Sequence, residues 1–302
     1  MDYICICMSP AIDANVTLPR APGGGGEVFK DAAVVENAGG KAVNVARWLA
    51  IRGGSVRCLG LLGEENDGPF AREFSRYGIA DGMLRVPGAT RRNEMIVWPG
   101  GSFKVNQAAF PDVAFDENAF LARLEGSEDL GADSVVIVSG SLPKCCGADF
   151  YAKTVAAVRR RGAFAVLDSS GGPMRLALEA HPDLVKPNAG ECADLVGFVP
   201  GSAADFARAT ELLREKAAHV IISDGEKGAW FDGEFVAAPS VRCVDSTAAG
   251  DTLLAEYCYR RFSAERLDLR FAVAAGSAAV EMPGSNPPPP DRVDELVSKA
   301  GL

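Results

Sequence analysis

The residues best suited to chemistry lie near the end of the sequence, where a run of small side chains leads into an aspartate. Thr247, Ala248, Ala249 and Gly250 come directly before Asp251. The apolar residues that follow recur at the spacing of one buried helical face. The aspartate can cap that helix, or it can accept a proton beside an anion bound to the free N–H groups of the helix N-terminus. These residues alone leave both interpretations open.

Composition limits the classes of protein to consider. The chain has 302 residues, of which 48% are hydrophobic and 24% charged, as in an ordinary globular protein. Its net charge of −9 argues against nucleic acid or an anionic membrane as a partner, because both bind basic surfaces. Eight cysteines without a C-x-x-C pair and only two histidines argue against a zinc site and favour free thiols. With no long apolar signal at the N-terminus, we expect a cytoplasmic protein.

Short apolar runs alternate with helical patterns along most of the chain. The runs are apolar on both faces, as strands of a buried parallel sheet must be, and they cover residues 3–8, 55–63, 134–143, 163–170 and 219–225. Helical patterns cover residues 41–53, 148–162 and 203–217. This order predicts βαβ units and a three-layer α/β/α fold with a mostly parallel central sheet, in one domain over residues 1–302.

Two segments interrupt this alternation. Residues 14–38 and 83–106 are rich in turn residues and short alternating strands. We expect them to form a small β-sheet lid, which could exclude water from a transfer reaction. The alternative is a pair of long surface hairpins.

Polar residues follow several of the predicted strands. In an open parallel sheet, ligands bind at the carboxyl ends of the strands, and the candidates there are Asp13, Gly39, Gly40, Lys41, Asn44, Ser139, Ser141, Lys186, Asn188, Glu191, Ser223, Gly225 and Gly228. Each alone has an ordinary explanation, but glycine loops together with a magnesium-ready acid are typical of a nucleotide site. The P-loop, Rossmann and G-x-S-x-G patterns are all missing, which disfavours those classes.

Two motifs resemble those of a known family. "AGGKAVNVARWLA" is similar to the G-G-K-x-x-N-x-A signature of ribokinase-like (PfkB) sugar kinases, and "DSTAAGDTLLA" to their D-T-x-G-A-G-D signature. "SGSLP", "KPNAGE", "SDGEKGA" and "AAGSAAV" follow in the family's order, so the resemblance covers nearly the whole chain. It implies an ATP-dependent phosphotransferase with an alcohol group as acceptor, an α/β/α core, and a β-sheet lid through which two chains form a homodimer.

The resemblance also implies a role for each matching residue. Asp251 would be the base, and the amides of Ala249, Gly250 and Asp251 would form the anion hole. The sugar would be bound by Asp13, Gly40, Lys41, Asn44 and Ser141, and ATP by Lys186, Asn188, Ser223, Gly225 and Gly228. Glu191 and Asn188 would organise Mg²⁺ through water. Some relatives also use a monovalent cation such as K⁺ near the anion hole.

A second resemblance limits the substrates that are expected to accept the phosphate. Lys41, the lid segment "TRRN" and "SGSLP" resemble the branch that phosphorylates sugar phosphates, which includes 1-phosphofructokinase and tagatose-6-phosphate kinase. The acceptor would then be fructose 1-phosphate, tagatose 6-phosphate or fructose 6-phosphate. A substrate phosphate needs cations on an acidic protein, and Arg91, Lys41 and Lys30 are the candidates. Lys30 would reach the site of a neighbouring chain. The alternative for Arg91 is a solvated lid charge.

The sequence departs from the family pattern at two small residues. Ala248 and Ala42 stand where glycine is usual. If position 248 requires a positive φ, alanine is strained there. Two alternatives therefore stay open: a kinase of an unphosphorylated sugar or nucleoside, and a catalytically weak member that binds nucleotide or sugar phosphate.

Overall fold

The central element of the fold is a nine-stranded sheet. The computed structural model describes residues 1–107 and 113–299. Within them the strand order is β13-β12-β11-β10-β9-β8-β1-β4-β5, parallel from β5 to β11 and antiparallel at β12 and β13. The bounds are β1 Asp2–Cys7, β4 Ser55–Gly63, β5 Ala80–Val86, β8 Ser134–Ser139, β9 Phe164–Asp168, β10 Leu184–Val185, β11 His219–Ser223, β12 Gly228–Phe231 and β13 Glu234–Ala237.

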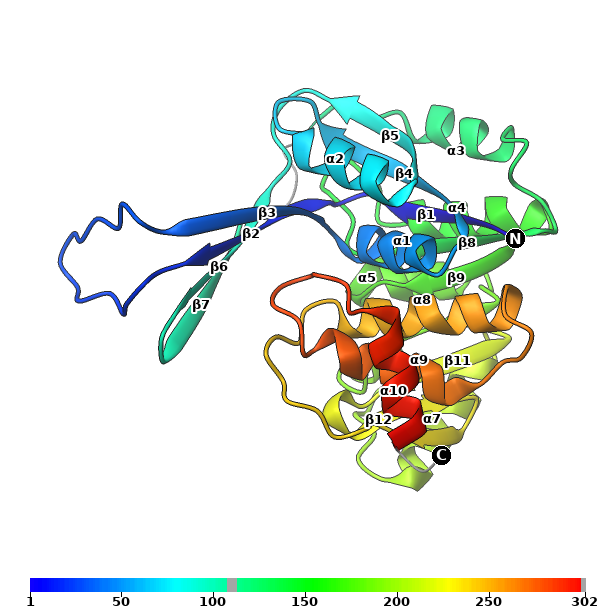
Figure 1. Ribbon diagram of the computed structural model, residues 1–302. Helices are drawn as coiled ribbons and strands as arrows, with labels where there is room; N and C mark the ends of the chain where they lie inside the picture. Colours follow the sequence, from blue (N-terminus) through cyan, green and yellow to red (C-terminus); the bar gives the residue numbers. More distant parts are fainter. Residues whose placement is uncertain (108–112, 300–302) are drawn as a thin grey trace.

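Helices cover both faces of this sheet (Figure 1). Alternate residues of β1 enter different cores: Cys5 packs on one side and Ile4 and Ile6 on the other. The first side is covered by α1 Lys41–Ile51, α2 Gly68–Tyr77, α8 Ala249–Phe262, α9 Leu269–Ala279 and α10 Pro290–Lys299. The second side is covered by α3 Glu117–Glu125, α4 Phe150–Arg160, α5 Gly171–Leu178, α6 Cys192–Val196 and α7 Ala203–Arg214. The predicted three-layer α/β/α fold is confirmed, and the runs that are apolar on both faces explain it.

A second sheet of four strands extends away from the body (Figure 1). Its order is β3-β2-β6-β7, with β2 Ala11–Thr17, β3 Ala33–Gly39, β6 Arg92–Trp98 and β7 Gly101–Asn106. We call it the lid sheet. The expected segment 83–106 begins too early, because Met83 to Val86 continue β5 and pair with β4 in the main sheet. The segment 14–38 begins too late, since β2 starts at Ala11.

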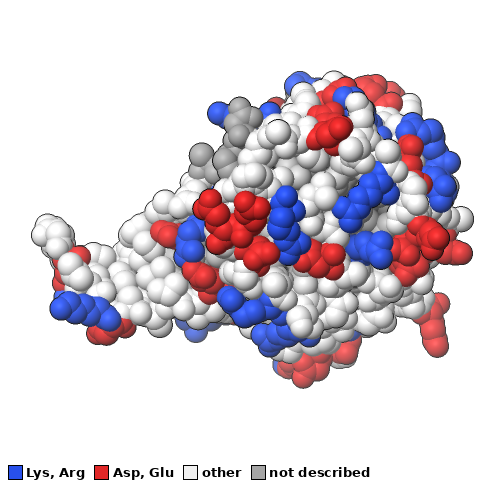
Figure 2. Space-filling model, turned by 90° about the horizontal axis from the view of Figure 1, so that it is seen from above, with Lys and Arg blue, Asp and Glu red and all other residues white. Residues whose placement is uncertain are grey.

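The surface carries both signs of charge. Figure 2 shows Lys and Arg interspersed with Asp and Glu over the face seen from above, on a chain with a net charge of −9. Among the residues that the structure describes, no helix combines the length and apolar character needed to span a bilayer.

Candidate active site

A cavity of about 410 Å³ brings together most of the polar residues that the sequence pointed to. It is lined by Asp13, Gly40, Lys41, Asn44, Arg91, Asn93, Lys186, Asn188, Glu191, Ser223, Thr247, Ala248, Gly250 and Asp251. These residues come from the lid sheet and the residue before β6, from the N-terminal ends of α1 and α8 and the residues just before them, from the segment after β10, and from the last residue of β11. Such a position, at the carboxyl ends of parallel strands, is where open α/β sheets bind ligands.

Asp251 lies in the first turn of α8 and is almost fully buried, with 6% of its surface exposed. Its Oδ2 accepts a hydrogen bond of 2.8 Å from Nδ2 of Asn44, which α1 supplies. Burial raises the pKa of Asp251 above the usual aspartate value, although the nearby Lys41 ammonium opposes the shift. A less acidic carboxylate is a better proton acceptor, so the geometry favours the base interpretation of Asp251 over a plain helix cap.

A buried carboxylate that the sequence analysis missed holds two lysines beside this site. Asp168, at the end of β9, accepts from Nζ of Lys41 at 2.7 Å and lies 3.3 Å from Nζ of Lys186. Burial alone would raise the pKa of Asp168, but Lys186 and Lys41 outweigh it and hold that pKa below its usual value. The one available signal was its position at the polar end of the predicted strand 163–170.

The N-terminus of α8 is shaped for an anion. The first bond of this turn runs from the N–H of Thr252 to the carbonyl of Ala248. Before it, the N–H of Ala249 makes a long 3.5 Å contact with the carbonyl of Ser246, whereas those of Gly250 and Asp251 have no backbone acceptor among the described residues. Lys186 faces the same turn, because a Cβ added at Gly250 would lie 3.4 Å from its Nζ. Free amides, the helix dipole and an ammonium thus converge on one point.

Ala248 adopts the left-handed conformation, with φ 63° and ψ 1°. The sequence predicted strain if position 248 had a positive φ, and it does. Alanine is strained in this conformation, whereas glycine would adopt it without strain. The preceding loop is held by Asp245, whose Oδ1 accepts from the backbone N–H of Thr247 at 2.9 Å and from its Oγ1 at 2.7 Å. Oδ2 of Asp245 accepts from the N–H of Gly284 at 3.2 Å.

The lid side of the cavity is organised around Asp13. Its Oδ1 accepts from Nδ2 of Asn93 at 3.0 Å, and its Oδ2 accepts from Oγ of Ser285 at 2.8 Å. The glycine pair before α1 is required here: a Cβ at Gly39 would lie 2.4 Å from the Asp13 carboxylate, and Gly40 has φ 114°. Asn93 and Ser285 were missed as site residues, because only the fold brings them to Asp13.

Arg91 enters the cavity without a carboxylate partner among the described residues. Its guanidinium makes long contacts to the carbonyls of Pro10 at 3.3 Å and Ser9 at 3.5 Å, and to Oδ1 of Asn93 at 3.3 Å. The neighbouring Arg92 is different, since it pairs with Glu36 at 2.5 Å on the lid sheet. The positive charge of Arg91 is therefore available to a bound anion.

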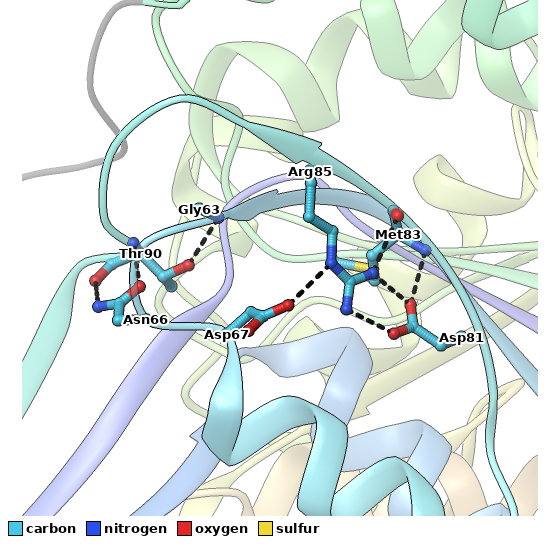
Figure 3. A network of polar contacts seen from close by, with 7 residues as sticks. All are labelled: Gly63, Asn66, Asp67, Asp81, Met83, Arg85 and Thr90. Carbon is cyan, nitrogen blue, oxygen red and sulfur yellow. Dashed lines mark hydrogen bonds and ion pairs between the residues drawn. The ribbon is translucent and has the colours of Figure 1, made fainter.

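A polar network at the base of the lid holds the residue before Arg91 (Figure 3). Oδ1 of Asn66 accepts from the N–H of Thr90 at 2.7 Å, and Nδ2 of Asn66 donates to the carbonyl of Thr90 at 2.9 Å. The Thr90 hydroxyl accepts from the N–H of Gly63 at 2.9 Å. A second, more exposed group beside it joins Arg85 to Asp67 and Asp81 (Figure 3).

Asn188 and Glu191, which the sequence analysis expects beside a nucleotide and Mg²⁺, line the same cavity. Asn188 and Glu191 bond reciprocally: the N–H of Asn188 donates to Oε2 of Glu191 at 2.8 Å, and the N–H of Glu191 donates to Oδ1 of Asn188 at 2.9 Å. Among the described residues no group of three acidic, histidine or cysteine side chains could ligate a metal directly. One carboxylate on an open pocket fits Mg²⁺ that retains most of its water.

Several predicted site residues do not line the cavity. Ser141 is exposed, and its carbonyl accepts from the Tyr151 hydroxyl at 3.3 Å. Lys30 is exposed and belongs to the long connection between β2 and β3. That connection lies at the outer end of the lid (Figure 1). Gly225 begins a short 3₁₀ turn, and Gly228 packs in the β12–β13 hairpin, where a Cβ would lie 2.1 Å from the carbonyl oxygen of Val236.

Comparison with known proteins identifies the family. The model described as pfkB family carbohydrate kinase matches residues 5–292. The chain belongs to the PfkB family of carbohydrate kinases. It is 36% identical over 303 residues to a 1-phosphofructokinase of Rhodobacter capsulatus, covering 96% of this chain and 94% of that protein. A 1-phosphofructokinase of Escherichia coli strain K12 is 31% identical, with 93% and 91% covered.

A solved structure supports the same fold. Phosphofructokinase-2 from Escherichia coli in complex with potassium matches with a TM-score of 0.86 and 24% identity, covering 99% of each chain. Family membership and these relatives confirm the predicted class of this PfkB protein, an ATP-dependent sugar-phosphate kinase that transfers phosphate to an alcohol group.

The strain at Ala248 predicts a stabilising substitution. Ala248→Gly relieves a left-handed alanine, which costs about 1–2 kcal/mol, but it also increases the freedom of the unfolded chain. We expect a net gain of up to about 1 kcal/mol in the free energy of unfolding, measured by urea denaturation. The matched control Ala249→Gly changes a residue with helical φ and should lose stability. Equal losses in both variants would contradict the prediction.

The network of Figure 3 predicts unequal contributions from its two halves. Asn66→Ala leaves the backbone N–H and carbonyl of buried Thr90 without partners, so we expect a loss of about 1–3 kcal/mol in the free energy of unfolding. Arg85→Met removes partly exposed ion pairs and should cost less than about 1 kcal/mol. Urea denaturation of both variants checks the order, and the reverse order would contradict it.

Proposed function

We propose that this PfkB kinase transfers the γ-phosphate of ATP to a hydroxyl of fructose 1-phosphate, with tagatose 6-phosphate and fructose 6-phosphate as the next candidates. The observation that carries the proposal is one cavity that joins the buried Asp251 carboxylate to the unpaired Arg91 guanidinium. The choice of sugar phosphate draws on the relatives named 1-phosphofructokinase.

The chemistry of phosphoryl transfer determines the role that we propose for each residue. The transition state is loose and spreads negative charge over the transferred group, so positioning and electrostatic stabilisation outweigh base strength. In this proposal Asp251, oriented by Asn44, accepts the proton of the acceptor hydroxyl. The amides of Ala249, Gly250 and Asp251, together with Lys186, stabilise the transferred group.

The remaining residues divide between the two substrates. Glu191 and Asn188 would hold Mg²⁺ through water, and the ion when bound neutralises charge on the phosphates of ATP. Asp13 and Asn93 would bind sugar hydroxyls, because they offer an acceptor and an amide at the lid side of the cavity. Arg91 would pair with the phosphate of the substrate. Lys30 remains a proposed contribution from a second chain.

A monovalent cation such as K⁺ remains part of the proposal. Its support is the potassium complex of phosphofructokinase-2 from Escherichia coli. A cytoplasmic setting is likewise proposed, because five of the cysteines, Cys5, Cys7, Cys58, Cys192 and Cys258, are buried as free thiols.

A homodimer through the lid is supported by the two faces of the lid sheet. Side chains alternate along a strand, so the register puts Val16, Val34, Ile96 and Phe103 on the face opposite Asp13. Val34 and Phe103 are 55% and 46% exposed there. The same face also carries Glu36, Arg92 and Glu94, whose charges pair with one another. The exposed apolar side chains beside them need a partner, and we propose that a second copy of the chain covers them.

Replacing the proposed base tests the mechanism. Asp251→Asn should lower kcat by roughly 10²-fold or more, because the hydroxyl proton loses its acceptor. Stability should be kept or raised at neutral pH: the pKa of folded Asp251 lies above that of the unfolded chain, so the ionised group costs stability there, and this cost fades as pH falls. Coupled ADP release and urea denaturation measure both, and wild-type kcat in the variant would remove Asp251 from the mechanism.

The raised pKa of Asp251 also predicts the pH dependence of the wild-type enzyme. Activity requires the ionised carboxylate, so it should decline with falling pH at a higher pH than an ordinary aspartate would allow. The decline should be missing from the residual activity of Asp251→Asn. A pH–rate profile of both proteins checks this, and an identical acid limb in the variant would contradict it.

The role of Arg91 is tested with substrates that differ in their phosphate. Arg91→Met should raise KM for the sugar phosphate by about 10-fold or more, since a charged hydrogen bond is lost, and should leave KM for ATP unchanged. Arg92→Met is the matched control, because its charge is paired with Glu36. ADP release is measured with the three sugar phosphates, ribose and adenosine. Turnover of an unphosphorylated acceptor with no effect of Arg91→Met would instead favour a kinase of that acceptor.

The proposed dimer is tested on the outer face of the lid. Phe103→Asp puts a charge into the apolar row and should convert the dimer to a monomer in sedimentation velocity. Val35→Asp is the control, because Val35 is also exposed, at 55% against 46% for Phe103, but shares the face of Asp13. A wild-type monomer, or equal dissociation of both variants, would contradict the proposal.

A further inference from the structure

One lysine of the lid contacts the loop that leads into α8. Nζ of Lys104, on β7, donates to Oδ1 of Asp245 at 3.1 Å and to Oγ1 of Thr247 at 2.8 Å. Asp245 is buried with 7% of its side chain exposed, whereas the lysine side chain is 45% exposed. Among the ion pairs that the structure describes, this is the one that joins the lid sheet to the body.

The acceptor of this contact determines the shape of the phosphoryl site. Asp245 binds the N–H and hydroxyl of Thr247 and the N–H of Gly284, and so fixes the loop that carries Ala248 in its left-handed conformation. Burial would raise the pKa of Asp245, but the hydrogen bonds from Thr247 and Lys104 outweigh it and lower that pKa. A carboxylate at neutral pH therefore stands three residues before Ala248, in the loop that leads to the amides of Gly250 and Asp251.

The donor of the contact shares a sheet face with the substrate residues. Lys104 pairs with Met95 across β6 and β7, and Asn106 pairs with Asn93 two positions along. Alternation puts Lys104, Asn93 and Asp13 on one face of the lid sheet. Any movement of the lid toward or away from a bound sugar would therefore move the Lys104 ammonium relative to Asp245.

From this geometry we propose that Lys104 is a positioning residue that couples the lid to the anion hole. When the lid rests on the sugar, the ammonium holds the Asp245 loop in the arrangement that presents the α8 amides to the phosphoryl group. The expected effect of Lys104 on the rate of phosphoryl transfer rests on the proposed function. An exposed ion pair contributes little, but a misplacement of about 1 Å at a reacting centre can cost up to about 10²-fold in rate.

The first test compares the effect on kcat of removing Lys104 with the effect of removing another cation of the lid. Lys104→Met should lower kcat for phosphoryl transfer by about 10-fold while leaving KM for ATP unchanged. Arg92→Met removes a lid cation whose partners, Glu36 and Glu94, also lie on the lid, and should keep wild-type kcat. In Lys104→Ala, propylammonium chloride should restore part of kcat, and tetramethylammonium chloride should not. Equal kcat in the Lys104 and Arg92 variants would overturn the proposal.

The second test does not depend on the identity of the sugar. Hydrogen exchange of the amides from Thr247 to Thr252 should be faster in Lys104→Met than in Arg92→Met, both without substrates. Unchanged exchange in Lys104→Met overturns the coupling, whatever the enzyme phosphorylates. Faster exchange in a protein that turns over none of the sugar phosphates supports the coupling and overturns the proposed substrate instead.

Discussion

The first turn of α8 has to leave backbone N–H groups unsatisfied beside a buried carboxylate, and the rest of the site is arranged around that requirement. Free amides in the first turn attract an anion, whereas Asp251 repels one. The conflict is eased by Lys186 and Lys41, which Asp168 holds within reach of both groups. Asp168 in turn is buried at the end of β9, so the central sheet itself sets the positions of these charges.

The lid sheet carries the polar groups that we propose bind the sugar, and it is anchored to the body at several points. Its strands start only a few residues after β1 and β5, and Asn66 fixes Thr90 at that junction. Asp13 is tied to Ser285 near the other end of the chain. Residues from distant parts of the sequence thus meet where the lid joins the body, which restricts how the lid can move.

The sequence predicted the layers of the fold because its strands are apolar on both faces and its helices on one. It also predicted most of the cavity, since Asp251, Asn44, Lys41 and Asp13 stand in motifs or directly after strands. The start of the second lid segment was wrong, since nothing local distinguishes the end of β5 from a lid strand. Asp168, Asn93, Ser285 and Lys104 were missed because their partners are far away along the chain.

The lid sheet uses both of its faces, and this limits how it can change during evolution. Asp13 and Asn93 lie on the face that lines the cavity, while Val34 and Phe103 lie on the opposite face. Insertion or deletion of a single residue within β6 would move the β6 side chains on one side of the change to the opposite face of the sheet, so that Asn93 and Asp13 could no longer share a face if that part included Asn93. New specificities can therefore arise by substitution within the strands or by length changes in their connecting loops, but not by shifting a strand by one position.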